Sequence, residues 1–128
     1  EKLSYNQTQA CYSCHLQENA FADHNTVGIG STGVHGLRNP NSLTNTGYYT
    51  SYSWANPSLG TLESFIERPI TNDDPIELGV DTNEKMDEVL ARFSSDTKYQ
   101  ELFSKAYPNV QNPYTLENIV KVRFFLGG

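Results

Sequence analysis

The amino-acid sequence predicts a small, mostly α-helical domain with long loops. The chain has 128 residues, which is the size of one domain. Apolar residues recur at helical spacing through its C-terminal half, and neither a strand-rich block nor an internal repeat is evident. Residues 25–56 are instead rich in Gly, Ser, Thr, Asn and Tyr, which is typical of a long loop. We therefore expect an all-α fold in a single domain over residues 1–128.

Two helices are expected in the first 68 residues. The first is short and covers residues 8–16. The second covers residues 61–68 and has three apolar residues on one face. We expect it to end at Pro69, because proline cannot donate the next backbone hydrogen bond.

Three further helices are expected in the C-terminal half, each with an apolar face. One is capped near Asn83 and one begins near Asp96. The last follows Asn112 and Pro113, a capping residue and a proline suited to the first helical position. Their apolar residues, which we assign to the core, are Met86, Val89, Leu90 and Phe93, then Tyr99, Leu102, Phe103 and Ala106, then Leu116, Ile119, Val120 and Phe124.

Charge and hydropathy exclude two classes of partner. The chain carries 15 acidic and 9 basic residues, a net charge of −6, so we expect no nucleic-acid partner. No apolar run is long enough to span a membrane, and no signal-peptide pattern opens the chain. Only 37% of the residues are hydrophobic, which predicts a modest core for the polypeptide alone.

The run Cys11-Tyr12-Ser13-Cys14-His15 contains both cysteines and one of the three histidines of the chain. Two thiols three positions apart, followed by histidine, form the attachment pattern of haem c, in which the thiols add to the porphyrin's vinyl groups and the histidine ligates the iron. A redox-active dithiol and half of a zinc site are the alternatives. The first usually sits in a βαβ unit and the second needs two more ligands, so we favour one covalent haem c.

A covalent haem also suits the composition of the chain. The macrocycle adds a large apolar surface around which short helices and loops can pack, and this offsets the modest core. Haem is attached covalently outside the cytoplasm, so we expect a periplasmic or extracellular protein. We accordingly interpret Glu1 as the start of a mature or trimmed product.

Two residues outside this motif are candidates for redox chemistry. Glu77 lies among apolar and turn residues; near an open haem iron it could move a proton between the oxygens of peroxide, or it could be a surface loop glutamate. Trp54 follows three tyrosines in the long loop. It could relay an oxidising equivalent, or it could pack on the haem or the core.

Three residues are candidates for a sixth ligand of the iron. His24 and His35 could each close the iron to peroxide, although loop histidines are more often exposed or hydrogen bonded. Met86 could serve in an electron-transfer cytochrome, but it lies in an apolar helical stripe and core packing is the better interpretation.

The order of these features resembles the N-terminal half of the bacterial di-haem cytochrome c peroxidase superfamily, which includes MauG-like enzymes. Further similarity to the branch associated with methanobactin operons, which oxidises a tryptophan of a partner protein to kynurenine, comes from Gly30-Ser31-Thr32-Gly33, Trp54-Ala55-Asn56-Pro57 and Glu77-Leu78-Gly79. The matching segments are Leu3-Ser4, the Cys11 to His15 motif, Ala20-Phe21-Ala22-Asp23, Arg38 to Asn45, Tyr49 to Trp54, Leu62-Glu63, Pro69-Ile70 and Pro75 to Gly79.

The resemblance implies a cytochrome c-like fold with long loops around the haem, and a role for each candidate. His15 would be the proximal ligand of the peroxide-reacting haem, Glu77 the distal acid–base group, and Trp54 the residue between two haems. Asn39 would help to bind a calcium ion. Hydrogen peroxide would be the oxidant, and the reductant would be an electron-donor protein or an oxidisable residue of a partner protein.

The sequence also departs from the family pattern. Phe65 stands where many relatives have a distal glutamine, and Ser31 where the classical peroxidases have a distal histidine, which favours an open iron. The family's Trp-Asp-Gly-Arg run is Trp54-Ala55-Asn56-Pro57 here. Relatives continue into a second haem domain, which is absent here, so we expect that the chain is a fragment, that the second haem comes from another chain, or that the protein works with one haem. A mono-haem electron carrier is the alternative function.

Overall fold

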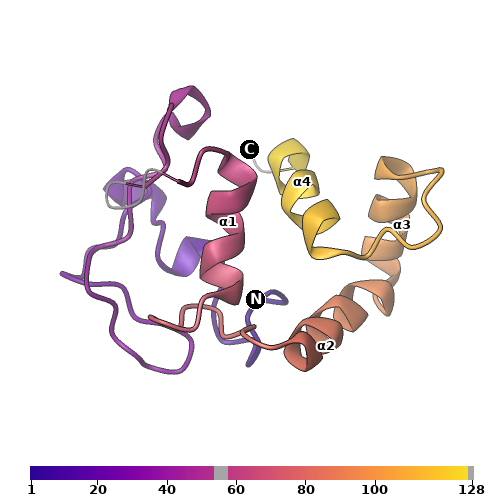
Figure 1. Cartoon of the computed structure of the whole chain (residues 1–128), viewed down its shortest axis with the longest axis horizontal. Coiled ribbons are helices and arrows are strands. Elements are labelled where there is room, and N and C mark those ends of the chain that lie inside the picture. Colours follow the sequence, from indigo (N-terminus) through magenta and orange to yellow (C-terminus); the bar gives the residue numbers. More distant parts are fainter. Residues whose placement is uncertain (54–57, 127–128) are drawn as a thin grey trace.

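The computed structural model describes residues 1–53 and 58–126; for residues 122–126 it describes the backbone alone. These residues form four α-helices, three short 3-10 turns and no strand, which confirms the predicted all-α class (Figure 1). None of the helices described is long and apolar enough to cross a membrane. The elements are η1 (Cys11–Ser13), η2 (Gln17–Asn19), η3 (Thr46–Tyr48), α1 (Leu62–Thr71), α2 (Asn83–Ser94), α3 (Thr97–Ala106) and α4 (Leu116–Leu126).

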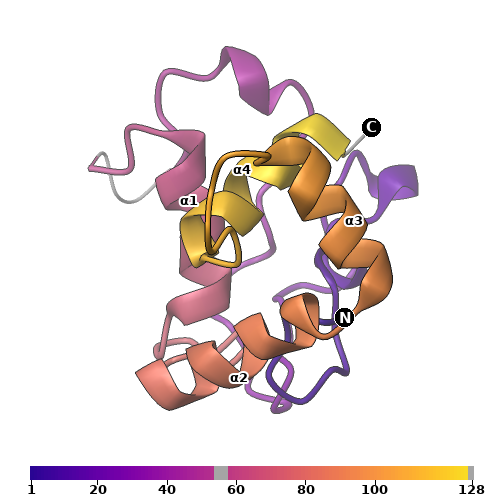
Figure 2. The same cartoon turned by 90° about the vertical axis from the view of Figure 1, so that its right-hand side faces the viewer.

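The helices pack in two pairs and the N-terminal half covers one side of them. Helix α1 lies beside α4, and α2 turns directly into α3 (Figures 1 and 2). Most of the loops before α1 lie on the other side of α1 from α3, whereas the N-terminus lies between α1 and α2, against α2 (Figure 1). Residues 20–53 consist of loops with the single turn η3, as the composition predicts.

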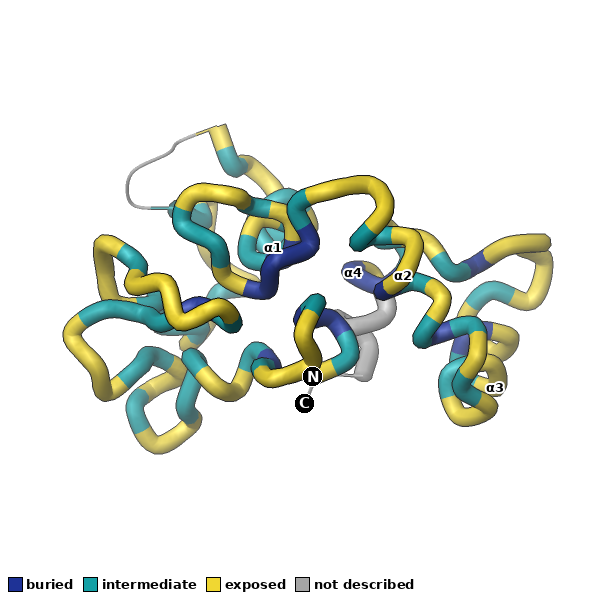
Figure 3. The backbone as a smooth tube through the Cα atoms, turned by 90° about the horizontal axis from the view of Figure 1, so that it is seen from below, coloured by how far each residue is buried: buried dark blue, intermediate teal, exposed yellow. Residues whose placement is uncertain are grey.

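The hydrophobic core belongs to the helical half. Its buried residues gather where the helices meet, and several of them are dark blue in Figure 3. Met86 packs against this cluster, which confirms its assignment to the core. The buried members of the cluster are Leu3, Ile70, Leu78, Val80, Val89, Phe93, Phe103, Ile119 and Val120.

Short polar side chains start the helices. Thr82 Oγ1 accepts from the backbone N–H of Lys85 at 3.3 Å, and Asp96 caps α3 in the same way, as the sequence predicts. The last helix begins later than predicted. Its first turn is capped by Thr115, whose Oγ1 accepts from Asn118 N at 3.2 Å, because the predicted cap, Asn112, instead closes a turn that precedes the helix.

The prediction that Pro69 ends the second helix is wrong, because α1 continues to Thr71. The last turn is stabilised from outside the helix. Pro69 O accepts from Leu78 N at 2.8 Å and Ile70 O from Val80 N at 3.0 Å, while the Ile70 side chain is buried in the core. These bonds satisfy carbonyl groups that a helix end leaves without partners, and they outweigh the one hydrogen bond that proline cannot donate.

The predicted helix over residues 8–16 is also wrong in kind. The chain forms the 3-10 turn η1 there, and a second turn, η2, after Leu16. The side chain of Ser13 accepts from Ala10 N at 3.1 Å and so competes with regular helical bonding at the start of the turn.

Candidate functional site

The Cys11 to His15 motif folds as one tight turn. The carbonyl of Cys11 accepts from both Cys14 N, at 3.3 Å, and His15 N, at 3.0 Å. Cys11, Cys14 and His15 are each half-buried. The turn thus keeps two thiols and one imidazole within a few residues of each other and within reach of a ligand at the protein surface.

The imidazole of His15 is oriented by a backbone carbonyl. Its Nδ1 lies 2.8 Å from the oxygen of Phe21, a contact that requires the proton to be on Nδ1. The lone pair of the neutral ring is then on Nε2. A ring fixed in this way by a carbonyl at its other nitrogen is the usual arrangement of a metal-ligating histidine.

The carbonyl that orients His15 is itself placed by an unusual backbone. Ala20 and Phe21 have φ values of 54° and 60°, in the left-handed region that side chains other than glycine rarely adopt. The loop residues Ser42 and Thr44 stabilise this reversal, because both of their hydroxyls donate to Ala20 O, Thr44 Oγ1 at 3.0 Å. These two hydroxyls were not among the candidates predicted from the sequence, although both lie within the segment from Arg38 to Asn45 that resembles the family.

Glu77 lies on a loop whose backbone is held at the peptide group that joins Glu77 to Leu78. Ser31 N donates to Glu77 O at 2.7 Å, and Leu78 N donates to Pro69 O at 2.8 Å. Gly30 makes the first contact possible, because a Cβ atom there would lie 1.9 Å from the carbonyl oxygen of Ile76. The loop after α1 and the start of the long loop are therefore in direct backbone contact.

Electrostatics link Glu77 to the cysteine motif. Burial raises the pKa of the Cys14 thiol, and the negative charges of Asp23 and Glu77 raise it further. Burial also raises the pKa of Glu77 itself, against the opposing charge of Arg68. Glu77 is nevertheless an exposed residue. The fold thus brings the predicted acid–base carboxylate into the electrostatic range of the motif, although the two are far apart in sequence.

Asp23 and Asn39 build a second polar cluster beside the motif. The Asp23 carboxylate is almost fully buried, and hydrogen bonds from Asn25, first from its backbone N–H, lower its pKa. Asn39 Nδ2 donates to Asp23 O at 2.9 Å and also to Asn25 O. Within the described residues, no three His, Cys, Asp or Glu side chains gather as a metal site. Calcium takes six to eight oxygen ligands, so these residues alone do not fit that ion.

For the remaining candidates the structure gives no hydrogen bond to the Cys11 to His15 motif among the described residues. His24 is 69% exposed and its Nδ1 lies 3.5 Å from the Asp23 carboxylate, while His35 is exposed. Phe65, at the position of the relatives' glutamine, lies against Tyr52 with a ring separation of 6.3 Å. Trp54 lies outside the described residues.

The donor set of the motif fits a covalent haem. Two thiols can form the thioether links and the lone pair on Nε2 of His15 can ligate iron. The described part of the N-terminal half also exposes six large apolar or aromatic side chains. They are Tyr12, Phe21, Val34, Leu37, Tyr48 and Tyr49.

An all-helical chain with this turn, an oriented histidine and long loops is a cytochrome c-like domain. The family model for di-haem cytochrome c peroxidase matches residues 1–122, and the chain belongs to this family. Membership implies haem c as the cofactor and an oxidoreductase as the class of protein. This confirms the resemblance noted in the sequence.

A solved structure of similar fold agrees with this assignment. It is a MauG-like protein associated with microbial copper homeostasis, with a TM-score of 0.87 and 42% sequence identity. The similarity covers 93% of this chain but only 34% of that one, so the chain spans about a third of the length of the protein it resembles. No curated protein matches the chain.

Proposed function

We propose that this chain is the peroxide-reacting haem c domain of a peroxide-dependent oxidoreductase. Cys11 and Cys14 would hold the haem through thioether bonds, and His15 would ligate the iron through Nε2. The haem would supply an iron that takes two electrons from the reductant and passes them to peroxide. The observation that carries the proposal is the Cys11 to His15 turn, in which Phe21 O orients the His15 ring for ligation; the attachment of the Glu77 loop to Ser31 and Pro69 supports it.

Glu77 would act as the acid–base group. Burial raises its pKa, and this brings a carboxyl group closer to the pH at which it can both accept and donate a proton. It would take a proton from one oxygen of peroxide and return it to the other, which then leaves as water. Arg68, whose charge favours ionised Glu77, would keep the group able to accept the first proton.

The oxidised partner and the location follow from the family. The solved protein of similar fold is associated with copper homeostasis. We propose that the reductant is an electron-donor protein or an oxidisable residue of a partner protein, reached through Trp54, and that a second haem domain or chain takes part. Because haem is attached covalently outside the cytoplasm, we propose a periplasmic or extracellular location. Calcium would need ligands from another part of the protein besides Asn39.

The first test measures whether Glu77 moves protons. We expect Glu77→Gln to slow the optical change of ferric protein mixed with one equivalent of peroxide by roughly 10²- to 10⁴-fold, with the starting spectrum nearly unchanged. Glu18→Gln is the control, because Glu18 is exposed and close to the motif in sequence. Reaction of Glu77→Gln at the rate of the native protein would exclude this role. A native protein whose ferric spectrum is low-spin and inert to peroxide would instead indicate the electron carrier.

A further inference from the structure

Arg92, on α2, binds the N-terminal segment, residues 2–5, through its backbone. Nη1 donates to Ser4 O at 2.9 Å and to Lys2 O at 3.3 Å, and Nη2 donates to Tyr5 O at 2.7 Å. Nη2 also donates to the Glu88 carboxylate at 3.0 Å. The four N–H groups at the tip of the guanidinium thus have four acceptors, and three of these are the backbone carbonyls of Lys2, Ser4 and Tyr5.

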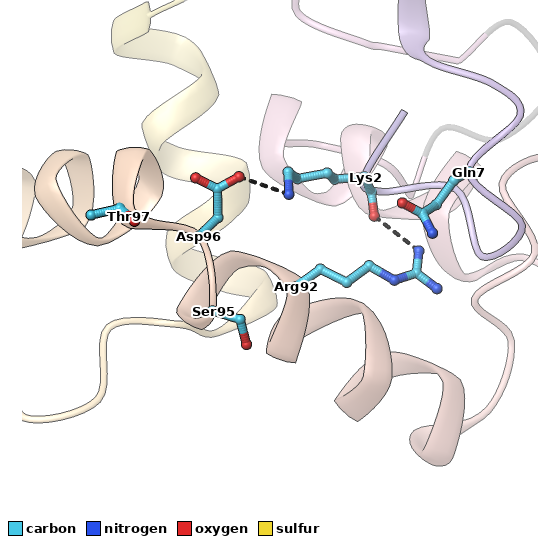
Figure 4. Close-up of a pocket in the computed structure, with 6 residues that line it drawn as sticks. All are labelled: Lys2, Gln7, Arg92, Ser95, Asp96 and Thr97. Atoms are coloured by element: carbon cyan, nitrogen blue, oxygen red, sulfur yellow. Dashed lines mark hydrogen bonds and ion pairs between the residues drawn. The ribbon is translucent and has the colours of Figure 1, made fainter.

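Other contacts support the same attachment. Lys2 forms an ion pair of 2.9 Å with Asp96, at the end of a cavity of about 460 Å³ that Arg92 also lines (Figure 4). The Arg92 guanidinium lies 5.9 Å from the centre of the Tyr5 ring, and the Lys85 ammonium lies 5.1 Å from it. The Arg92 side chain is only 14% exposed, so its hydrogen bonds are shielded from water.

The segment that Arg92 holds leads to Glu77 by two routes. Tyr5 N donates to Leu78 O at 2.8 Å, directly after Glu77 in the chain. On the other route, the side chain of Asn6 accepts from the buried Ser4 hydroxyl at 2.8 Å and donates to Ser31 O at 2.7 Å. Ser31 N in turn donates to Glu77 O.

We propose that Arg92 is a positioning residue for Glu77, acting through residues 4–6. The inference rests on the proposed acid–base role of Glu77. Arg92 fixes the carbonyl side of the segment, while Tyr5 N–H holds the loop at Leu78 O and the Asn6 amide holds it through Ser31 at Glu77 O. A guanidinium suits this task because its planar fork reaches several carbonyls at once, whereas an ammonium has three donors and no fork.

The test compares Arg92→Met with Glu88→Gln, which removes the charge of one partner of Arg92 and leaves the three carbonyl contacts in place. We expect Arg92→Met to slow the optical reaction with peroxide roughly 10- to 100-fold, because small displacements of a reacting group are costly. Its haem content and ferric spectrum should stay those of the native protein, and the pH at which its rate is half-maximal should shift. Glu88→Gln should react within about twofold of the native rate, since it leaves the positioned loop intact.

A double variant separates positioning from general stability. If Arg92 acts through Glu77, then Glu77→Gln with Arg92→Met reacts within about twofold of Glu77→Gln alone. A native rate for Arg92→Met, or an effect that adds in full to that of Glu77→Gln, overturns the inference. A native rate for Glu77→Gln overturns the proposed function instead. Should Arg92→Met not fold, Arg92→Lys replaces it; we expect an intermediate rate, and a native rate would again refute the positioning role.

Discussion

The contact of Gly30 with the Glu77 loop gives a quantitative prediction for Gly30→Ala. Gly30 is buried, and a Cβ there would lie 1.9 Å from Ile76 O, whereas ordinary contact begins at 3.4 Å. The two segments must therefore separate by about 1.5 Å. Overpacking of this kind costs about 1–3 kcal/mol, and loss of the Ser31–Glu77 hydrogen bond costs about 1–3 kcal/mol more, which gives a destabilisation of about 2–6 kcal/mol.

The assay is urea unfolding of the haem-loaded protein, with Gly47→Ala as the matched control. Nothing lies within 4 Å of a Cβ at Gly47, so the same substitution there should change the free energy of unfolding by no more than about 1 kcal/mol, and in the stabilising direction. Gly30→Ala should also react more slowly with peroxide, because the loop that carries Glu77 has moved. Equal stabilities of the two variants would refute this reasoning.

Two further predictions concern stability. Burial raises the pKa of Glu77 in the folded protein above its ordinary value of 4.5, so the folded state keeps this proton longer than the unfolded state, and the free energy of unfolding falls as the pH rises through that window. Unfolding measured from pH 4 to pH 8 should therefore show Glu77→Gln gaining stability relative to the native protein, and parallel curves would contradict this. Phe93 is 4% exposed, and its ring packs edge-on against the Tyr99 ring with 4.9 Å between the ring centres. Phe93→Ala should therefore lower the free energy of unfolding by about 3–5 kcal/mol in the same assay. A loss under about 1 kcal/mol would contradict this, because it would mean that neighbouring side chains fill the space left by the ring.

The helical half could be predicted from sequence because its rules are local. Apolar spacing located α2 and α3, and the capping residue Asp96 fixed the start of α3. The errors arose where distant contacts overrode local preference. Pro69 was expected to end α1, but the return of Leu78 and Val80 satisfies the last carbonyls of that helix.

The candidate site could be predicted only in part. The motif and its chemistry are readable in the sequence, because spacing and residue type carry the information. The orientation of His15 by Phe21 O depends on left-handed backbone at two residues that are not glycine. No local pattern indicates that conformation, and the role of Arg92 depends on contacts across most of the chain.

The uneven core has a consequence for how the cell controls this protein. Among the described residues, no hydrophobic side chain is buried between Ala10 and Ile70, so that half of the chain has little to hold it before the cofactor arrives. Segments with few buried apolar contacts open readily and are cut first by proteases. A chain that has not received its haem is therefore an easy substrate for degradation, and the amount of mature protein would follow haem supply without a dedicated sensor.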